Sequence, residues 1–167
     1  MILLMAAPVL LGAALGYLFG GRLHHLADLR LKALPLLLAA ALLQAAQFAG
    51  VTLFGLSLIG PVFVLVGVWG LLNLRDPGCP VRPPLAVILA GGAMNGLAIL
   101  VNGRMPFAGT SGETPKHEVM DAATRLPWLG DVIPVPGTHL LISVGDLLLV
   151  AGIGWLIAAG MRAPRTV

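Results

Sequence analysis

The feature that constrains this chain most is a run from residue 33 to residue 74 that contains no charged side chain. At ~1.5 Å rise per residue, one continuous helix of that length would be about twice the ~30 Å thickness of a bilayer's hydrocarbon core. The run must therefore fold back on itself. We expect the reversal between Gly50 and Gly55, which predicts two spans at residues 33–49 and 54–74, with a bend at Pro61. A turn at Gly60-Pro61 is the alternative, and it would leave the second span short.

The remainder of the chain continues this pattern. Hydrophobic residues make up 58% of the sequence and charged residues 10%, whereas a typical soluble domain carries about 25% charged residues. So few charges could not cover the surface of a water-soluble fold. Further apolar runs predict spans at residues 2–19, 85–101 and 140–161. We therefore expect an all-α integral membrane protein, a bundle of about five transmembrane helices in a single membrane domain that covers residues 1–167.

The positive residues predict how the bundle is oriented in the lipid bilayer. The first twenty residues carry no charge, so they lack the positive region of a signal peptide and are expected to remain as a helix. Positive residues are retained in the cytoplasm. With the N-terminus outside and the C-terminus in the cytoplasm, seven Lys and Arg residues lie inside and three outside, the inner ones being Arg22, Arg30, Lys32, Arg75, Arg82, Arg162 and Arg165, and the outer ones Arg104, Lys116 and Arg125.

Two features near the N-terminus predict helix contacts. In residues 22–32 apolar and polar side chains separate onto opposite helical faces, which is typical of a helix lying in the interface plane. Gly12, Gly16 and Gly20 recur at a spacing of four, which places them on one helix face and lets another backbone approach closely. Packing within the chain is the expected use of this glycine face, and contact with a second copy or a membrane partner is the alternative.

Polar side chains inside spans are costly to bury, so they are the best pointers to function. Gln44, Asn95 and Asp146 each fall roughly 10 Å below the predicted outer surface. Gly91, Gly92 and Gly96 would let another helix come close enough for Asp146 to hydrogen-bond the Asn95 amide. These groups either hold the helices together or line a polar pocket open to the outside. Asp146 is then a neutral hydrogen-bond donor, an ion or proton site, or the partner of Arg104. The residues of this candidate pocket are Gln44, Gln47, Asn95, Asn102, Ser143 and Asp146.

The predicted outer loop, residues 102–138, is expected to be partly helical or re-entrant, with a short helix over residues 116–125 and an apolar stretch anchored by Trp128. His117, Glu118 and Asp121 resemble a zincin helix, but Asp121 stands where the second histidine belongs, and Cys79 is the one cysteine, so we predict no metal and no cofactor. The candidate site in this loop comprises Arg104, Lys116, His117, Asp121 and Asp131.

Several motifs carry a resemblance to a known family. They are Met94-Asn95-Gly96, Asn102-Gly103-Arg104-Met105-Pro106, Lys116-His117, Thr124 with Leu126, Trp128-Leu129-Gly130-Asp131-Val132-Ile133-Pro134 and Ser143-Val144-Gly145-Asp146. Together they resemble a bacterial family of small polytopic membrane proteins classed as a domain of unknown function. The resemblance implies a multi-pass protein of the bacterial plasma membrane and draws attention to Asn95, Asn102, Arg104, Pro106, His117, Asp131 and Asp146, without assigning an activity.

Two functions remain open from the sequence. The first is a non-enzymatic membrane subunit or a protein that binds a small solute or a lipid in a polar pocket on the extracytoplasmic side. The second is a membrane-embedded hydrolase or transferase that uses Asp131, Asp146 and His117. In such an enzyme the two aspartates would act as a catalytic pair, in which one carboxyl is held protonated beside the other. A nucleic-acid partner is not expected, since the ten Lys and Arg residues are scattered along the chain.

Overall fold

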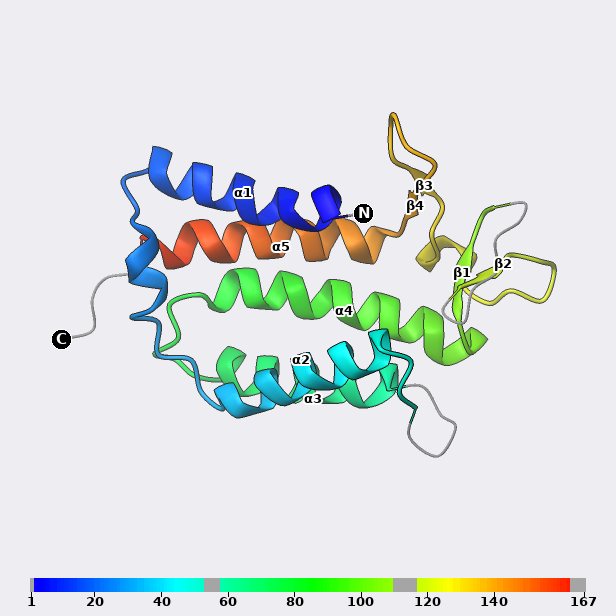
Figure 1. Ribbon diagram of the computed structural model, residues 1–167, viewed down its shortest axis with the longest axis horizontal. Coiled ribbons are helices and arrows are strands. Elements are labelled where there is room, and N and C mark those ends of the chain that lie inside the picture. The colour runs from blue at the N-terminus through cyan, green and yellow to red at the C-terminus, as the bar shows by residue number, and fades with distance from the viewer. Residues whose placement is uncertain (1, 53–57, 110–116, 163–167) are drawn as a thin grey trace. The chain divides into compact units, whose positions relative to one another are not determined.

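The structure, a computed structural model, describes residues 2–52, 58–109 and 117–162 of the chain, and for residues 2–5 it describes the backbone alone. Within these ranges the chain is mostly helical and forms five α-helices (Figure 1). They are α1 (Ile2–Leu18), α2 (Leu34–Phe48), α3 (Ile59–Leu74), α4 (Arg82–Asn102) and α5 (Val144–Gly160). The chain divides into two compact units, residues 1–86 with 153–167 and residues 87–152, and the division crosses α4 and α5.

Each of the five predicted apolar segments contains a helix in the described structure, but several boundaries differ from the expected ones. α3 begins at Ile59, and Pro61 therefore lies in its first turn, where a missing N–H removes no helical hydrogen bond. The predicted bend at Pro61 is wrong for this reason. Gly50 has a left-handed φ of 82° at the end of α2, in agreement with a reversal there. Residues 53–55 of the predicted turn lie outside the described residues.

Among the described residues, α4 is the one helix that is both long enough and apolar enough to cross a membrane. It is 21 residues long and begins at Arg82, three residues before the predicted span, so that Pro83 and Pro84 occupy its first turn. Residues 6–18 of α1, together with α2, α3 and α5, are apolar helical segments of shorter length.

In the first unit, α2 and α3 pack against each other, and a buried core forms around Trp69, Val81 and Leu85. Residues 22–32 do not form the predicted interfacial helix, which is a correction. They contain a 3₁₀ turn at Leu23–Leu26 followed by irregular backbone. Asn73, fully buried on α3, accepts a hydrogen bond from the Lys32 backbone N–H at 2.7 Å and donates one to the Lys32 carbonyl at 3.0 Å. In a helix the N–H and carbonyl of Lys32 would instead form hydrogen bonds with other backbone groups of the same helix.

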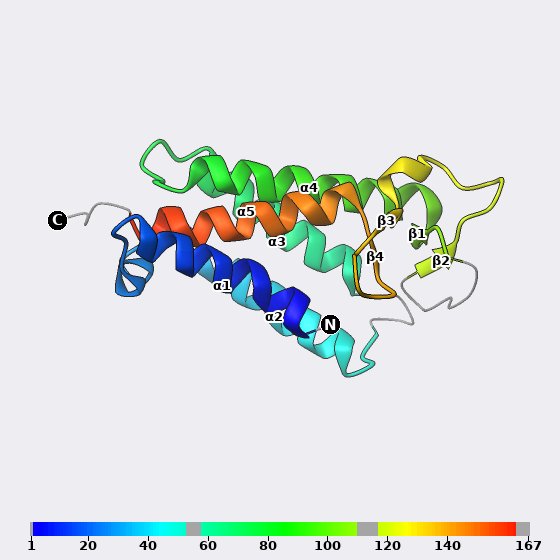
Figure 2. The ribbon, with the colours of Figure 1, turned by 90° about the horizontal axis from the view of Figure 1, so that it is seen from above.

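The glycine face of α1 packs within the chain. A Cβ on Gly12 would lie 2.5 Å from the Gly154 carbonyl oxygen of α5, and Gly16 is covered by the Met161 side chain. Figure 2 shows α1 running beside the C-terminal half of α5 within this unit. Packing within the chain is therefore confirmed at these two glycines, whereas Gly20 has a φ of 78° and nothing within 4 Å.

In the second unit, α4 and the start of α5 approach closely, and the connection between them forms short strands. β1 (Met105–Phe107) pairs in parallel with β2 (His117–Val119), and β3 (Ile133–Pro134) pairs antiparallel with β4 (Leu141–Ile142). The 3₁₀ helix η2 covers Pro127–Leu129. The predicted helix over residues 116–125 is wrong, because its first described residues form β2, whose partner strand lies more than ten residues earlier.

Candidate functional site

Three of the predicted polar residues form a closed hydrogen-bond network in the second unit. The Asn95 amide donates to Asp146 Oδ1 at 2.7 Å, and the Ser143 hydroxyl donates to Asn95 Oδ1 at 2.9 Å. The Ser143 backbone N–H donates to Asp146 Oδ2 at 3.1 Å, and the Asp146 backbone N–H donates to Ser143 Oγ at 2.9 Å. The hydrogen bond predicted between Asp146 and Asn95 is therefore present, and both carboxylate oxygens of Asp146 accept hydrogen bonds.

The two bonds between Ser143 and Asp146 form a capping box at the start of α5. Ser143 precedes the first helical residue, Val144, and Asp146 occupies the third helical position, so each side chain binds the other's backbone N–H. A carboxylate is also favoured there by the positive end of the helix dipole. Because α5 begins at residue 144 and not at residue 140, Asp146 lies in its first turn. The prediction that it is buried seven residues inside a helix is wrong.

Glycines bring this network together. A Cβ on Gly91 would lie 2.5 Å from the Gly145 carbonyl oxygen, and a Cβ on Gly145 would collide with Asn95 Oδ1. Gly92, by contrast, has open space around it, with nothing within 4 Å of the place that a Cβ would take. The close approach of α4 and α5 therefore depends on Gly91 and Gly145, and of these two only Gly91 was predicted from the sequence.

Asn102 has a separate role at the end of α4. Its amide group donates to the Arg125 carbonyl at 2.9 Å and accepts from the Arg125 backbone N–H at 2.8 Å. It also donates to the Ala98 carbonyl at 2.9 Å. Asn102 thus attaches the distant segment at Arg125 to the helix end. Gln44 and Gln47 lie on α2, in the first unit, and their membership of a pocket stays a prediction.

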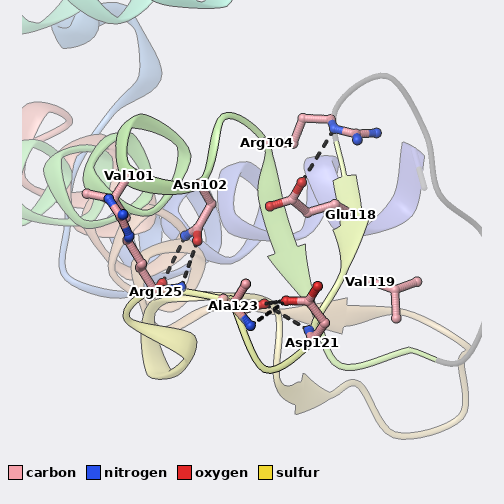
Figure 3. Close-up of a pocket in the computed structure, with 9 residues that line it drawn as sticks. Val101, Asn102, Arg104, Glu118, Val119, Asp121, Ala123 and Arg125 are labelled. Carbon is pink, nitrogen blue, oxygen red and sulfur yellow. Dashed lines mark hydrogen bonds and ion pairs between the residues drawn. The ribbon is translucent and has the colours of Figure 1, made fainter.

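A cavity of about 540 Å³ opens beside this attachment, and its lining is charged (Figure 3). Arg104 Nε lies 3.6 Å from Glu118 Oε2 across its wall. Asp121 Oδ1 accepts hydrogen bonds from the Ala123 backbone N–H at 2.9 Å and from the Thr124 hydroxyl at 3.2 Å, which fixes the turn after β2. The lining consists of Val101, Asn102, Arg104, Glu118, Val119, Asp121, Ala123, Thr124 and Arg125.

Asn102, Arg104 and Asp121 of this lining were predicted from the sequence as site residues, whereas Glu118 and Arg125 were missed. The missed residues lie more than five positions from one another in sequence, and only the pairing of β1 with β2 and the Asn102 attachment bring them to one place. Lys116, which was selected, lies outside the described residues.

Asp131 is the most unusual polar residue of the second unit. Its backbone N–H donates to the Pro106 carbonyl at 2.8 Å, and its own carbonyl accepts from the Ala108 N–H at 3.0 Å, so it is held along β1. Its side chain is 9% exposed, and Oδ2 lies 3.6 Å from His117 Nε2. Oδ1 is buried and has no hydrogen-bond partner among the described residues. Burial, with a smaller effect from the charge of Asp146, raises the pKa of Asp131 to about 7.

These contacts define what the second unit can do chemically. It offers a cavity with fixed charges of both signs and, separately, a buried carboxyl beside an imidazole. In the described part of the chain, no group of three or more His, Cys, Asp or Glu residues could hold a metal ion.

Comparison with known proteins gives one informative match. No curated protein matches the chain, and no solved structure matches it. A family model matches residues 28–158, which include most of the first unit and all of the second. The matched range contains every motif on which the resemblance was based. The chain therefore belongs to DUF5317, a family of unknown function.

Proposed function

We propose that this protein is embedded in the plasma membrane with its five helices crossing the bilayer, its N-terminus outside and its C-terminus in the cytoplasm. The support is the apolar surface of the helices, which is more stable in hydrocarbon than in water. Large apolar side chains point outward from every helix, and examples are Leu18 (75% exposed), Leu42 (71%), Val64 (62%), Leu100 (81%) and Trp155 (50%). In water each would retain an unfavourable hydration of about 25 cal/mol per Å² of apolar surface, whereas in hydrocarbon that cost disappears.

Helix length is compatible with this proposal. The shorter helices α1, α2, α3 and α5 have 15 to 17 residues, which correspond to roughly 23–26 Å at ~1.5 Å per residue. Thinner bilayer regions and flanking apolar residues can make up the difference from ~30 Å. The exposed cations Arg22, Lys32, Arg75 and Arg162 follow or precede helix ends in the first unit, on what would be the cytoplasmic side.

We propose further that the second unit carries a binding module on the extracytoplasmic side, in the connection between α4 and α5, whose cavity receives a small charged solute or a lipid headgroup. The observation that carries this is the cavity of about 540 Å³ lined by two arginines and two acidic residues. Its size falls within the range of small-molecule sites, ~300–1,000 Å³. Two cationic and two anionic side chains match a ligand that carries both a positive and a negative group. Each group of such a ligand can face side chains of the opposite charge.

The experiment is native mass spectrometry of the full chain released from detergent, comparing wild type with Arg125→Gln. Arg125 binds Asn102 through its backbone, so the substitution keeps the attachment and removes only the guanidinium. We expect a bound small molecule or lipid that is retained by wild type and by a His139→Gln control and is depleted in Arg125→Gln. The mass distinguishes a solute from a lipid. Identical adducts in all three proteins would contradict the proposal.

A hydrolase or transferase is the second candidate, and the raised pKa of Asp131 beside His117 favours it. A carboxyl with a pKa near 7, set 3.6 Å from an imidazole, has the character of a general acid or base. Asp146 is less suited to chemistry, since both of its oxygens serve the capping box and Asn95. In cells that produce equal amounts of wild type and Asp131→Asn, untargeted mass spectrometry of lipids and small molecules tests this candidate. A product lost only with Asp131→Asn supports it, and unchanged profiles exclude it.

A further inference from the structure

The backbone around Asp131 leaves its side chain little freedom to reach water. Hydrogen bonds to Pro106 and Ala108 hold Asp131 alongside Phe107 of β1, and the opposite edge of β1 is paired with β2. The neighbouring Gly130 is also tightly packed, because a Cβ there would lie 2.5 Å from the Pro106 carbonyl oxygen. The carboxyl is therefore fixed in a buried position by a small sheet rather than by a mobile loop.

Among residues 117–162 and the other described parts of the chain, the charged groups placed around Asp131 oppose one another. β1 and η2 carry no titratable side chain. β2 contributes His117, whose Nε2 is 3.6 Å from Asp131 Oδ2, and Glu118, whose carboxylate is paired with Arg104. α5 contributes Asp146, whose negative charge acts unfavourably on an ionised Asp131. Asp131 thus faces one group that can become positive and one that is negative.

An ionised Asp131 would leave a buried oxygen, Oδ1, without any donor in the described part of the structure. Burying an unsatisfied charged oxygen is costly. Asp131 does not line the 540 Å³ cavity, so relief of this cost must come from something other than a ligand in that cavity. A proton meets that requirement, since it removes the charge without needing space.

His117 provides the route for such a proton. Its side chain is 42% exposed, while that of Asp131 is 9% exposed, so the imidazole is the member of the pair in contact with solvent. An imidazole can both accept and donate a proton, which is why histidine often acts as a proton shuttle. A proton can therefore enter through the imidazole and reside on either member of the pair.

We propose that His117 and Asp131 form a binding site for a single proton, and that β2 transmits its occupancy to the charged cavity. Transmission follows from the strand itself, because β2 carries His117 and, as the next residue, the cavity-lining Glu118. Loss of the proton leaves two negative carboxylates, Asp131 and Asp146, near one another, and their repulsion acts on the sheet that contains β2. This regulation applies to the same second unit that we propose as a binding module, but it does not depend on the identity of any ligand.

The test uses the full chain in detergent micelles, with an environment-sensitive fluorophore on Ala123→Cys in a Cys79→Ser background. Ala123 lines the cavity and is exposed, and Cys79 is the one native cysteine, which is buried. We expect the fluorescence to change with pH along a one-proton curve with a midpoint near neutrality. Asp131→Asn should abolish the change, because the amide cannot ionise, and His139→Gln should leave it intact.

Two further outcomes keep the proposal decidable. If Asp131→Asn fails to fold, His117→Gln takes its place, and it should shift the midpoint of the transition because it removes one member of the pair. A transition that survives both substitutions unchanged, or the absence of any transition in wild type, would overturn the proposal. Since no ligand is added, a failure here is distinct from a failure of the cavity to bind solute or lipid.

Discussion

Each unit of the molecule buries a polar side chain that can be compared directly. In the first unit Asn73 is fully buried, and its amide makes three hydrogen bonds, to both backbone groups of Lys32 and to the Trp69 carbonyl. In the second unit Asp131 is similarly buried, yet Oδ1 has no partner in the described structure. Trp69 Nε1 is also buried without a partner there, but it is a neutral donor.

The difference teaches how to separate structural polar residues from candidate functional ones. Buried polar groups in native proteins are almost always hydrogen-bonded, and the exceptions call for an explanation. Asn73 needs none, because it fixes the irregular segment before α2 to α3. Asp131 does need one, and a carboxyl that binds a proton or takes part in chemistry supplies it.

The largest effect that we expect concerns the pH dependence set by Asp131. Its pKa in the folded protein, about 7, is above the ordinary 3.8, so the folded state binds this proton more tightly than the unfolded state does. The free energy of unfolding should therefore fall as pH rises between these two values, by as much as ~4 kcal/mol, and level off above the folded pKa. Thermal unfolding in detergent at a series of pH values measures this.

Asp131→Asn provides the control for that dependence. The amide resembles the neutral carboxyl, so this variant should lose the fall and be more stable than wild type at alkaline pH. A wild-type protein whose stability rose over the same interval would show that Asp131 is ionised and satisfied in the fold.

Removal of the fully hydrogen-bonded Asn73 side chain should destabilise the first unit. Asn73→Leu leaves the partly buried backbone N–H and carbonyl of Lys32 without their partner, which costs about 3 kcal/mol. The loss should be similar at every pH, unlike that of Asp131, because no titrating group is involved. Denaturant unfolding followed by circular dichroism compares the two, and a pH-dependent loss for Asn73→Leu would remove the distinction between them.

The close approach of α4 and α5 should be sensitive to one methyl group. Gly145→Ala places a Cβ against Asn95 Oδ1 and the Gly91 carbonyl, and overpacking of this kind costs about 2 kcal/mol. Gly92→Ala is the matched control, because Gly92 lies next to Gly91 on α4 but faces open space. With open space at that position, alanine should be neutral or stabilising by up to ~1 kcal/mol through helix propensity. Equal melting temperatures for the two variants would contradict the observed packing.

The smallest predicted effect belongs to the capping box. Ser143→Ala removes the hydroxyl that accepts from the Asp146 N–H and donates to Asn95, and the loss of such a cap costs about 1 kcal/mol. Thr138→Ala, in an exposed turn, is the comparison and should change stability less. If Ser143→Ala were as destabilising as Asn73→Leu, the network would be a main support of the fold rather than a local one.

The helices could be predicted from the sequence because long runs without charge leave few other possibilities. Segments whose structure depends on distant partners could not. Residues 22–32 have an amphipathic pattern, but Asn73, more than forty positions away, takes the backbone groups of Lys32. β2 exists because β1 pairs with it, and neither strand is long enough to be recognised alone.

The site was predicted unevenly for the same reason. Asn95, Ser143 and Asp146 were selected, and they do meet, since glycine and polar residues in apolar helices indicate close packing. The depth assigned to Asp146 was wrong, although the sequence holds the signal that corrects it. Ser143 and Asp146 have the spacing of a capping box, which places the helix start at residue 144. No local pattern marks the missing partner of Asp131 Oδ1.

The proposal that the connection between α4 and α5 lies outside the membrane is tested most directly by labelling Ala123→Cys, in a Cys79→Ser background, with a membrane-impermeant maleimide on intact cells. Ala123 lines the charged cavity and is exposed. We predict labelling without permeabilisation. Labelling that occurs only after the cells are permeabilised would contradict the orientation and, with it, the placement of the binding module on the extracytoplasmic side.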